Sequence, residues 1–168
     1  MPFKFSIRRA LAAASLAGAA LVAGCGGGGQ VEPFAPTRIL AFGDEYSAIE
    51  PDGRKYSING FRQTTVNGVA TDDPTTLDCT RFPIWIQGVA TQFGLAFDRC
   101  PGSATAPTGQ VLARPGQKVA DFAAQIAAVQ GAPRGEKDLA LVMFGMNDIL
   151  ELYGRYPTTG REALIAEA

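Results

Sequence analysis

Two short apolar runs without polar alternation lie far apart in the chain, at residues 39–42 and within residues 138–144. The first run ends at Gly43 and the second at Gly145. Uniformly apolar runs of this length are typical of parallel strands that are buried on both faces. We therefore predict that both runs are strands of one parallel sheet, with 138–144 as a central strand.

Apolar residues recur at helical spacing in two other segments. The first segment is 82–93, with Phe82, Trp85, Ile86, Val89 and Phe93 on one face, and the second is 119–129, which stops before Gly131 and Pro133. We interpret the Trp and Phe stripe of the first helix as core and not as a ligand platform. Residues 95–97 could add a short parallel strand, 101–115 reads as a loop, and a short helix is expected over 159–166.

The segment between the first strand and the first helix has a different pattern. Three short β-prone runs, at 55–58, 61–66 and 69–71, are separated by Asn59-Gly60 and Asn67-Gly68. These dipeptides favour type I′ turns. We predict a β-meander inserted near residues 54–73, ending at Asp72, Asp73 and Pro74.

Strands that alternate with helices indicate right-handed crossovers and a doubly wound α/β fold. The predicted fold is therefore a parallel sheet with helices on both faces. At 168 residues the chain has room for one such domain, assigned to 38–168. The last helix ends after about two turns, which is short for a stable helix, so we expect the domain to be incomplete at its C-terminus.

Residues 1–24 have the features of a secretory signal peptide. Lys4, Arg8 and Arg9 precede an apolar run, residues 10–23, that is too short to span a bilayer comfortably. Residues 21–25 resemble the bacterial lipobox, which predicts that Cys25 is the lipidated first residue of the mature protein. The alternative is an ordinary signal peptide followed by a chance cysteine.

The glycine run that follows, with Pro33 and Pro36 beyond it, predicts a flexible tether over 25–37. A lipid anchor would place the protein in the bacterial cell envelope, attached to the membrane without spanning it and facing the periplasm or the cell surface. Removing the signal changes the formal net charge from -1 to -4. This charge favours no nucleic-acid partner, and no cofactor is expected.

Cys79 and Cys100 remain as a pair in an exported, oxidising compartment. We predict a disulfide between them. Such a bond would close a loop of about twenty residues and contribute on the order of 3 kcal/mol in the chain-entropy model. The alternatives are a metal pair or free thiols; a zinc site is disfavoured because the chain contains no histidine.

The motifs that follow the two apolar runs resemble those of the GDSL/SGNH ester hydrolases. Residues 42–47, Phe-Gly-Asp-Glu-Tyr-Ser, are similar to the family's first block, Gly-Asp-Ser-x-Ser. Residues 145–148, Gly-Met-Asn-Asp, are similar to its Gly-x-Asn-Asp block. The resemblance covers residues 38–168 and implies a flavodoxin-like α/β fold and an esterase or lipase-like activity on ester bonds.

The resemblance also implies roles for individual residues. Asn147 matches the asparagine that donates to the oxyanion, and Gly116 resembles the glycine of the middle block. Gly43, Asp44, Ser47, Gly145 and Asp148 match supporting positions of the two motifs. The nucleophilic serine of the family falls on Glu45, for which we prefer a local structural role, and Ser47 would point away from the position of Glu45.

The family's base is also missing, because its histidine follows an aspartate near the C-terminus and this sequence has no histidine. Three hypotheses remain. The chain is part of a longer hydrolase whose base lies beyond Ala168, or it is a catalytically inactive SGNH-like lipoprotein that binds an ester, acylated or glycan ligand. In the third, the motifs are coincidental in another α/β lipoprotein.

Overall fold

The computed structural model describes residues 32–131, 134–156 and 158–167. The predicted signal peptide, Cys25 and most of the predicted tether lie outside the described residues. The chain divides into two units, residues 1–34 and 35–168. The helices and strands described here all belong to the second unit.

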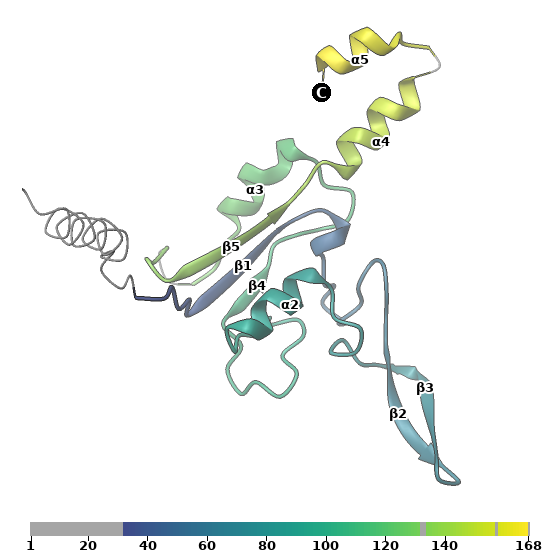
Figure 1. The fold of residues 1–168 in the computed structure, drawn as a ribbon, viewed down its shortest axis with the longest axis vertical. Helices are drawn as coiled ribbons and strands as arrows, with labels where there is room; N and C mark the ends of the chain where they lie inside the picture. The colour runs from purple at the N-terminus through teal and green to yellow at the C-terminus, as the bar shows by residue number, and fades with distance from the viewer. Residues whose placement is uncertain (1–31, 132–133, 157, 168) are drawn as a thin grey trace, which may run out of the picture. The chain divides into compact units, whose positions relative to one another are not determined.

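A three-stranded parallel sheet forms the centre of this unit (Figure 1). Its strands are β1 (Arg38–Gly43), β4 (Gly109–Val111) and β5 (Asp138–Met143), in the order β4-β1-β5. The predicted α/β class is therefore confirmed. The prediction that 138–144 is a central strand is wrong, because β1 occupies the centre and β5 pairs with β1 alone among the described strands.

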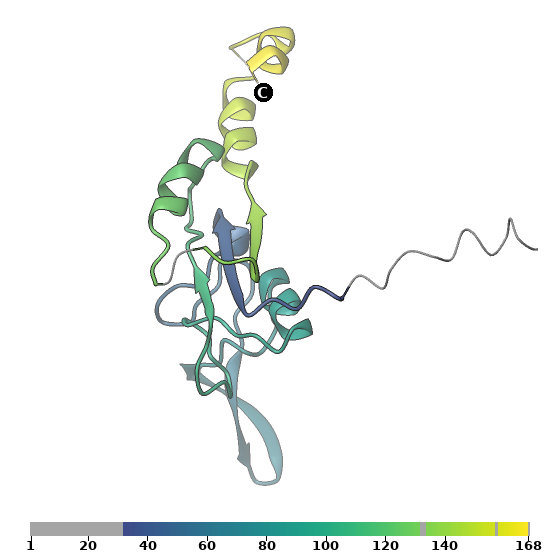
Figure 2. The same ribbon diagram turned by 90° about the vertical axis from the view of Figure 1, so that its left-hand side faces the viewer.

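Helices cover both faces of β1, as predicted. Ile39 and Ala41 pack in one core cluster with Ile86 and Ala90 of α2 (Trp85–Gln92). On the other face, the ring of Phe42 meets that of Phe122 in α3 (Phe122–Ala127), with centroids 5.6 Å apart. Figure 2 shows α2 and α3 on opposite sides of β1.

Strand β4 lies in the segment that the sequence assigned to a loop, and the predicted strand at 95–97 is absent. Phe97 makes only isolated bridges, to Cys100 and Gly109. Strand β4 begins at Gly109, where an added Cβ would lie 2.8 Å from both Ala96 O and Ile39 Cγ2. The close approach of β4 to β1 therefore requires a glycine, the residue type that indicated a loop.

The predicted three-stranded meander is wrong: the structure has a two-stranded antiparallel hairpin of β2 (Phe61–Val66) and β3 (Val69–Leu77). Its tip is a type I′ turn as predicted, because Asn67 and Gly68 have φ of 52° and 80°. Asn59-Gly60 forms no such turn. The Asn59 side chain instead accepts from the N–H of Lys55 and donates to its carbonyl, which holds a loop in place of the expected first strand.

Strand β3 also continues through the residues expected to end it. Phe61 pairs with Leu77 but Arg62 pairs with Asp73, so the register shifts between them. Pro74 falls in the unpaired stretch opposite this shift. An irregular ladder on an exposed strand tolerates a proline, because no ladder N–H is needed there.

The helices differ from the predictions mainly at their ends. Phe82 and Phe93 flank α2 and are exposed, so the predicted core stripe does not extend to them. The segment expected to form a helix over 119–129 contains the 3-10 turn η3 (Val119–Asp121) followed by α3. Helix α5 (Arg161–Glu167) lies where a short helix was expected, whereas α4 (Met146–Arg155) was not predicted.

The predicted disulfide between Cys79 and Cys100 is present, with an S–S distance of 2.03 Å. Close to it, the buried Lys55 ammonium donates to the backbone carbonyls of Cys79, Arg81 and Phe82. Both interactions join the base of the hairpin to the core. Within the described ranges, no helix has the length and apolar character needed to cross a bilayer.

Candidate functional site

The carboxyl end of β1 forms a tight turn that only glycine can make. Gly43 has φ of +148°, and a Cβ there would lie 2.2 Å from the carbonyl oxygen of Met143 in β5. The buried Asp44 follows, and its Oδ1 accepts from the N–H of Tyr46 at 3.1 Å. Asp44 thereby caps the 3-10 turn η2 (Glu45–Ser47), which places Glu45 at the end of the central strand.

Three segments converge on the carboxylate of Glu45. Its Oε2 accepts from the backbone N–H of Gly116 at 3.0 Å and from Nδ2 of Asn147 at 2.8 Å. The backbone N–H of Glu45 itself also donates to this carboxylate. The residue is 8% exposed. The structure thus brings together the three residues that the sequence marked as nucleophile position and oxyanion donors.

The surroundings of Glu45 favour its ionised form. Burial opposes ionisation, but the hydrogen bonds from Asn147 and from the N–H groups of Glu45 and Gly116 outweigh it and lower the pKa below its ordinary value. A carboxylate with a lowered pKa and several donors is a weak base and a weak nucleophile near neutral pH. Glu45 therefore acts as an acceptor that holds the site together.

Asn147 is itself held by the loop that carries Gly116. Its Nδ2 also donates to the carbonyl of Gln117 at 3.0 Å, and Oδ2 of the neighbouring Asp148 accepts from the N–H of Val119 at 3.1 Å. Gly145, with φ of +116°, precedes α4, and the first turn of this helix contacts the same loop through these two hydrogen bonds. Asp148 therefore joins two segments of the site.

Gln125 in α3 binds the backbone of Gly43 next to the site, and it was not identified from the sequence. Its Oε1 accepts from the N–H of Gly43 and its Nε2 donates to the carbonyl of Gly43, both at 2.8 Å. The side chain is buried, and it binds the backbone where β1 turns. A signal was available, because Gln125 is a polar residue on the apolar face that includes Phe122 and Ile126.

Ser47, which matches the second serine of the motif, has a different environment. It is fully buried, and its Oγ accepts from Nε1 of Trp85 at 3.2 Å. This hydrogen bond fixes η2 against α2. The Ser47 hydroxyl is therefore engaged in the core and not in the cluster around Glu45.

The described residues include no group of three or more His, Cys, Asp or Glu side chains that could hold a metal ion. The site consists of amide donors around one carboxylate, a set that binds an oxygen atom carrying negative charge. Comparisons with protein-family models, with curated proteins and with solved structures found no match to this chain.

Proposed function

We propose that this chain is a lipid-anchored protein of the bacterial cell envelope with an SGNH-hydrolase-like domain that binds its ligand without hydrolysing it. One observation carries the proposal: the Glu45 carboxylate, at the position of the family's nucleophile, accepts hydrogen bonds from Gly116 and Asn147. These two residues match the family's oxyanion donors.

The geometry explains why hydrolysis is not expected. An ester hydrolase of this kind needs a hydroxyl to attack the carbonyl carbon and free donors for the oxyanion that develops. In this chain the hydroxyl is replaced by a carboxylate, and Oε2 of that carboxylate engages the donors. A substrate carbonyl would have to displace this ionised, hydrogen-bonded carboxylate from the donors. The site without substrate is therefore more stable than the site with a substrate carbonyl bound to the donors.

The envelope location is supported by the sequence of residues 1–37 and is compatible with the disulfide. Cys25 would carry the lipid, and the glycine-rich tether would separate the membrane from the domain. The Cys79–Cys100 disulfide is of the kind that persists in an oxidising compartment.

We further propose that additional polypeptide completes the sheet at β5. Ala140, Val142 and Met143 of this strand are exposed, and α4 presents an exposed apolar stripe formed by Met146, Ile149, Leu150 and Tyr153. An unprotected apolar edge strand readily accepts another strand. An ester hydrolase is the second candidate function, in which such polypeptide would supply the missing base and a substrate would displace Glu45 from Gly116 and Asn147.

Hydrolysis of p-nitrophenyl acetate by the purified chain tests the proposal. We expect no turnover above the buffer rate for the wild type, and none for Glu45→Ser, because a serine without a base is not activated. Glu136→Ser, a substitution at an exposed carboxylate just before β5 and outside the donor cluster, is the matched control and should also give no turnover. Wild-type turnover that falls by about 100-fold in Asn147→Ala, the usual effect of losing an oxyanion donor, would instead establish the hydrolase.

A further inference from the structure

We propose that the pocket beside Glu45 binds a saccharide, with Tyr56 as the stacking surface and Glu50, Asp52 and Arg54 as hydrogen-bonding partners. This inference rests on the proposed function and names its ligand class. The pocket has a volume of about 560 Å³ and is lined by these four residues and by Pro115, among others. Pockets of a few hundred Å³ hold small-molecule ligands, and this volume fits one or two sugar rings.

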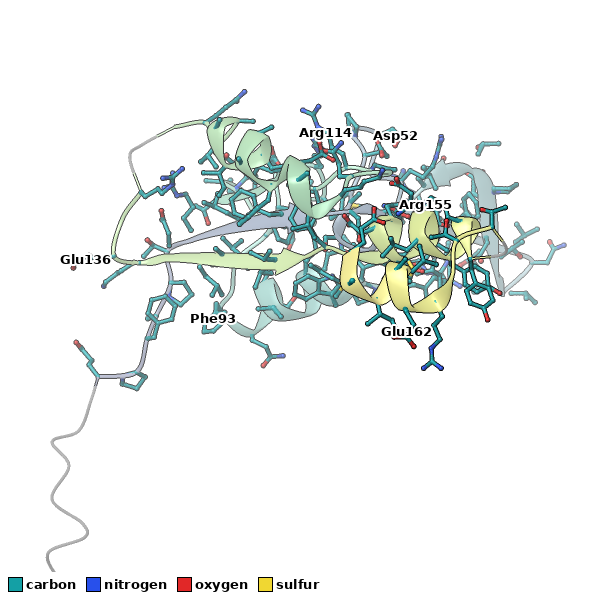
Figure 3. All side chains as sticks on the ribbon, turned by 90° about the horizontal axis from the view of Figure 1, so that it is seen from above. Asp52, Phe93, Arg114, Glu136, Arg155 and Glu162 are labelled. Carbon is teal, nitrogen blue, oxygen red and sulfur yellow. A yellow bond between two sulfur atoms is a disulfide. The ribbon has the colours of Figure 1, made fainter. Side chains whose placement is uncertain are left out.

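The pocket lies next to the donor cluster. Pro115 forms part of its lining, and the next residue, Gly116, donates to Glu45. Figure 3 shows the side chain of Asp52 on the same side of the unit as that of Arg114, which precedes Pro115. A ligand in this pocket would therefore lie beside the carboxyl end of β1, where ligands bind in open α/β sheets.

Two tyrosines provide an aromatic surface at this place. The ring of Tyr46, the residue after Glu45, meets that of Tyr56 edge to face, with centroids 5.8 Å apart. Tyr56 is 63% exposed. An edge-to-face pair leaves an open face on at least one ring. Since a sugar ring has an apolar face of C–H groups, such an open ring surface can stack against it.

The polar side chains of the pocket offer both donors and acceptors. Arg54 Nη2 lies 2.9 Å from Asp52 Oδ2, and both side chains are more than half exposed. Within the described residues, the Glu50 carboxylate has no hydrogen bond or ion pair. The Arg54 guanidinium can donate to the hydroxyls of a neutral polyol, and the carboxylates of the pocket can accept from them, because a hydroxyl is donor and acceptor at once.

The loop that carries these residues is fixed before a ligand binds. The N–H of Glu50 donates to the carbonyl of Arg54 at 2.8 Å, and Ile49 forms a bridge with Lys55. Lys55 is buried and holds three carbonyls, while Asn59 binds the Lys55 backbone. Asp52 also holds the loop, because its Oδ1 accepts from the N–H of Arg54 at 3.0 Å. The loop is therefore held by its own hydrogen bonds, and little ordering is needed on binding.

Titration of the purified chain with cellobiose and with N,N′-diacetylchitobiose, followed by calorimetry, tests this inference. We expect saturable binding of at least one sugar by the wild type. Tyr56→Ala should weaken that binding by about tenfold or more, which is the loss of one stacked ring contact. Tyr56→Phe keeps the ring and should change the affinity by less than about threefold. Tyr153→Ala, at an exposed tyrosine in α4, is the matched control and should bind as the wild type does.

Saturable binding of choline without binding of either sugar would overturn the inference in favour of a cationic ligand, which the acidic groups and tyrosines would also suit. Absence of binding by the wild type, or unchanged affinity in Tyr56→Ala, would overturn it as well. The ester assay is a separate measurement. A chain that hydrolyses the ester and binds the sugar contradicts the proposed non-hydrolytic role alone, and a chain that does neither contradicts the sugar pocket alone.

Discussion

Strands β1 and β5 have similar sequences and very different surroundings. Each is a short apolar run followed by an element of the site. Strand β1 ends at Gly43, and β5 ends two residues before Gly145. In β1 the side chains from Ile39 to Phe42 are all buried, with Ile39 at 0% exposure. In β5 only Leu141 is buried, and Val142 is 49% exposed. An apolar run therefore predicts a strand, but it does not predict whether other elements cover that strand on both faces.

The two strands also differ in the groups that surround their carboxyl ends. The end of β1 is surrounded by polar groups that are paired, with Gln125 on Gly43 and with Gly116 and Asn147 on Glu45. The end of β5 leads into the exposed apolar stripe of α4. Paired buried polar groups fix one conformation, whereas an exposed apolar surface is suited to contact with further polypeptide.

The strongest test of this contrast is truncation of one β-branched side chain in each strand. Ile39→Ala should lower the free energy of unfolding by about 2–5 kcal/mol, because it opens a cavity in the core. Val142→Ala should change it by no more than about 0.5 kcal/mol, as at an ordinary surface position. Urea unfolding followed by circular dichroism measures both values.

A cost for Val142→Ala similar to that for Ile39→Ala would show that β5 is covered in solution. In a longer polypeptide that completes the sheet, the cost of Val142→Ala should rise toward that of a buried valine. The comparison therefore tests the proposed completion of the sheet at β5.

A smaller effect is expected when the polar support of the β1 end is removed. Gln125→Leu should destabilise the chain by about 1–3 kcal/mol, because it leaves the N–H of Gly43 buried without its acceptor. Gln130→Leu is the control, since Gln130 lies near the end of the same segment and its side chain contributes no such pair. Equal stability of the Gln125→Leu and Gln130→Leu chains would contradict the role of Gln125.

The smallest expected effect is on the pH dependence of stability, and it concerns Glu45 at the end of β1. Since the folded pKa of Glu45 lies below its unfolded value, the stability that Glu45 contributes is present above the unfolded pKa, and it is lost as the pH falls through the folded pKa. Thermal unfolding measured from neutral pH down to about pH 3, below the ordinary pKa of glutamate, should therefore show a steeper fall in Tm for the wild type than for Glu45→Gln.

Other carboxylates with lowered pKa, such as Asp138 beside Arg38, make both chains sensitive to acid. The difference between the two curves isolates Glu45. Parallel curves for the wild type and Glu45→Gln would show that the hydrogen bonds to Glu45 do not favour its charge.

The features that the sequence predicted best are those that depend on residue type and spacing alone. The run at 39–42, the turn at Asn67-Gly68 and the disulfide all follow from residue type and spacing. Strand β4 was missed because its glycine is required by a neighbouring strand. The meander failed because Asn59 binds the Lys55 backbone, and no pattern in a single sequence shows such a contact.

The candidate site was predicted in its members but not in its arrangement. The motifs placed Glu45 and Asn147 at the ends of two strands, and parallel strands bring such ends together. That the Glu45 carboxylate would accept from Gly116 and Asn147 depends on a side-chain conformation. Gln125 was overlooked because a polar residue within an apolar face does not reveal its partner.

The tight turn at Gly43 bears on how natural variation in this protein should be interpreted. A side chain at this position would collide with the Met143 carbonyl whether or not the site performs any chemistry. A lineage that lost an ancestral activity would therefore still keep this glycine, since selection for folding alone retains it. Invariance of Gly43 among relatives would thus be evidence of shared architecture and not of a shared activity.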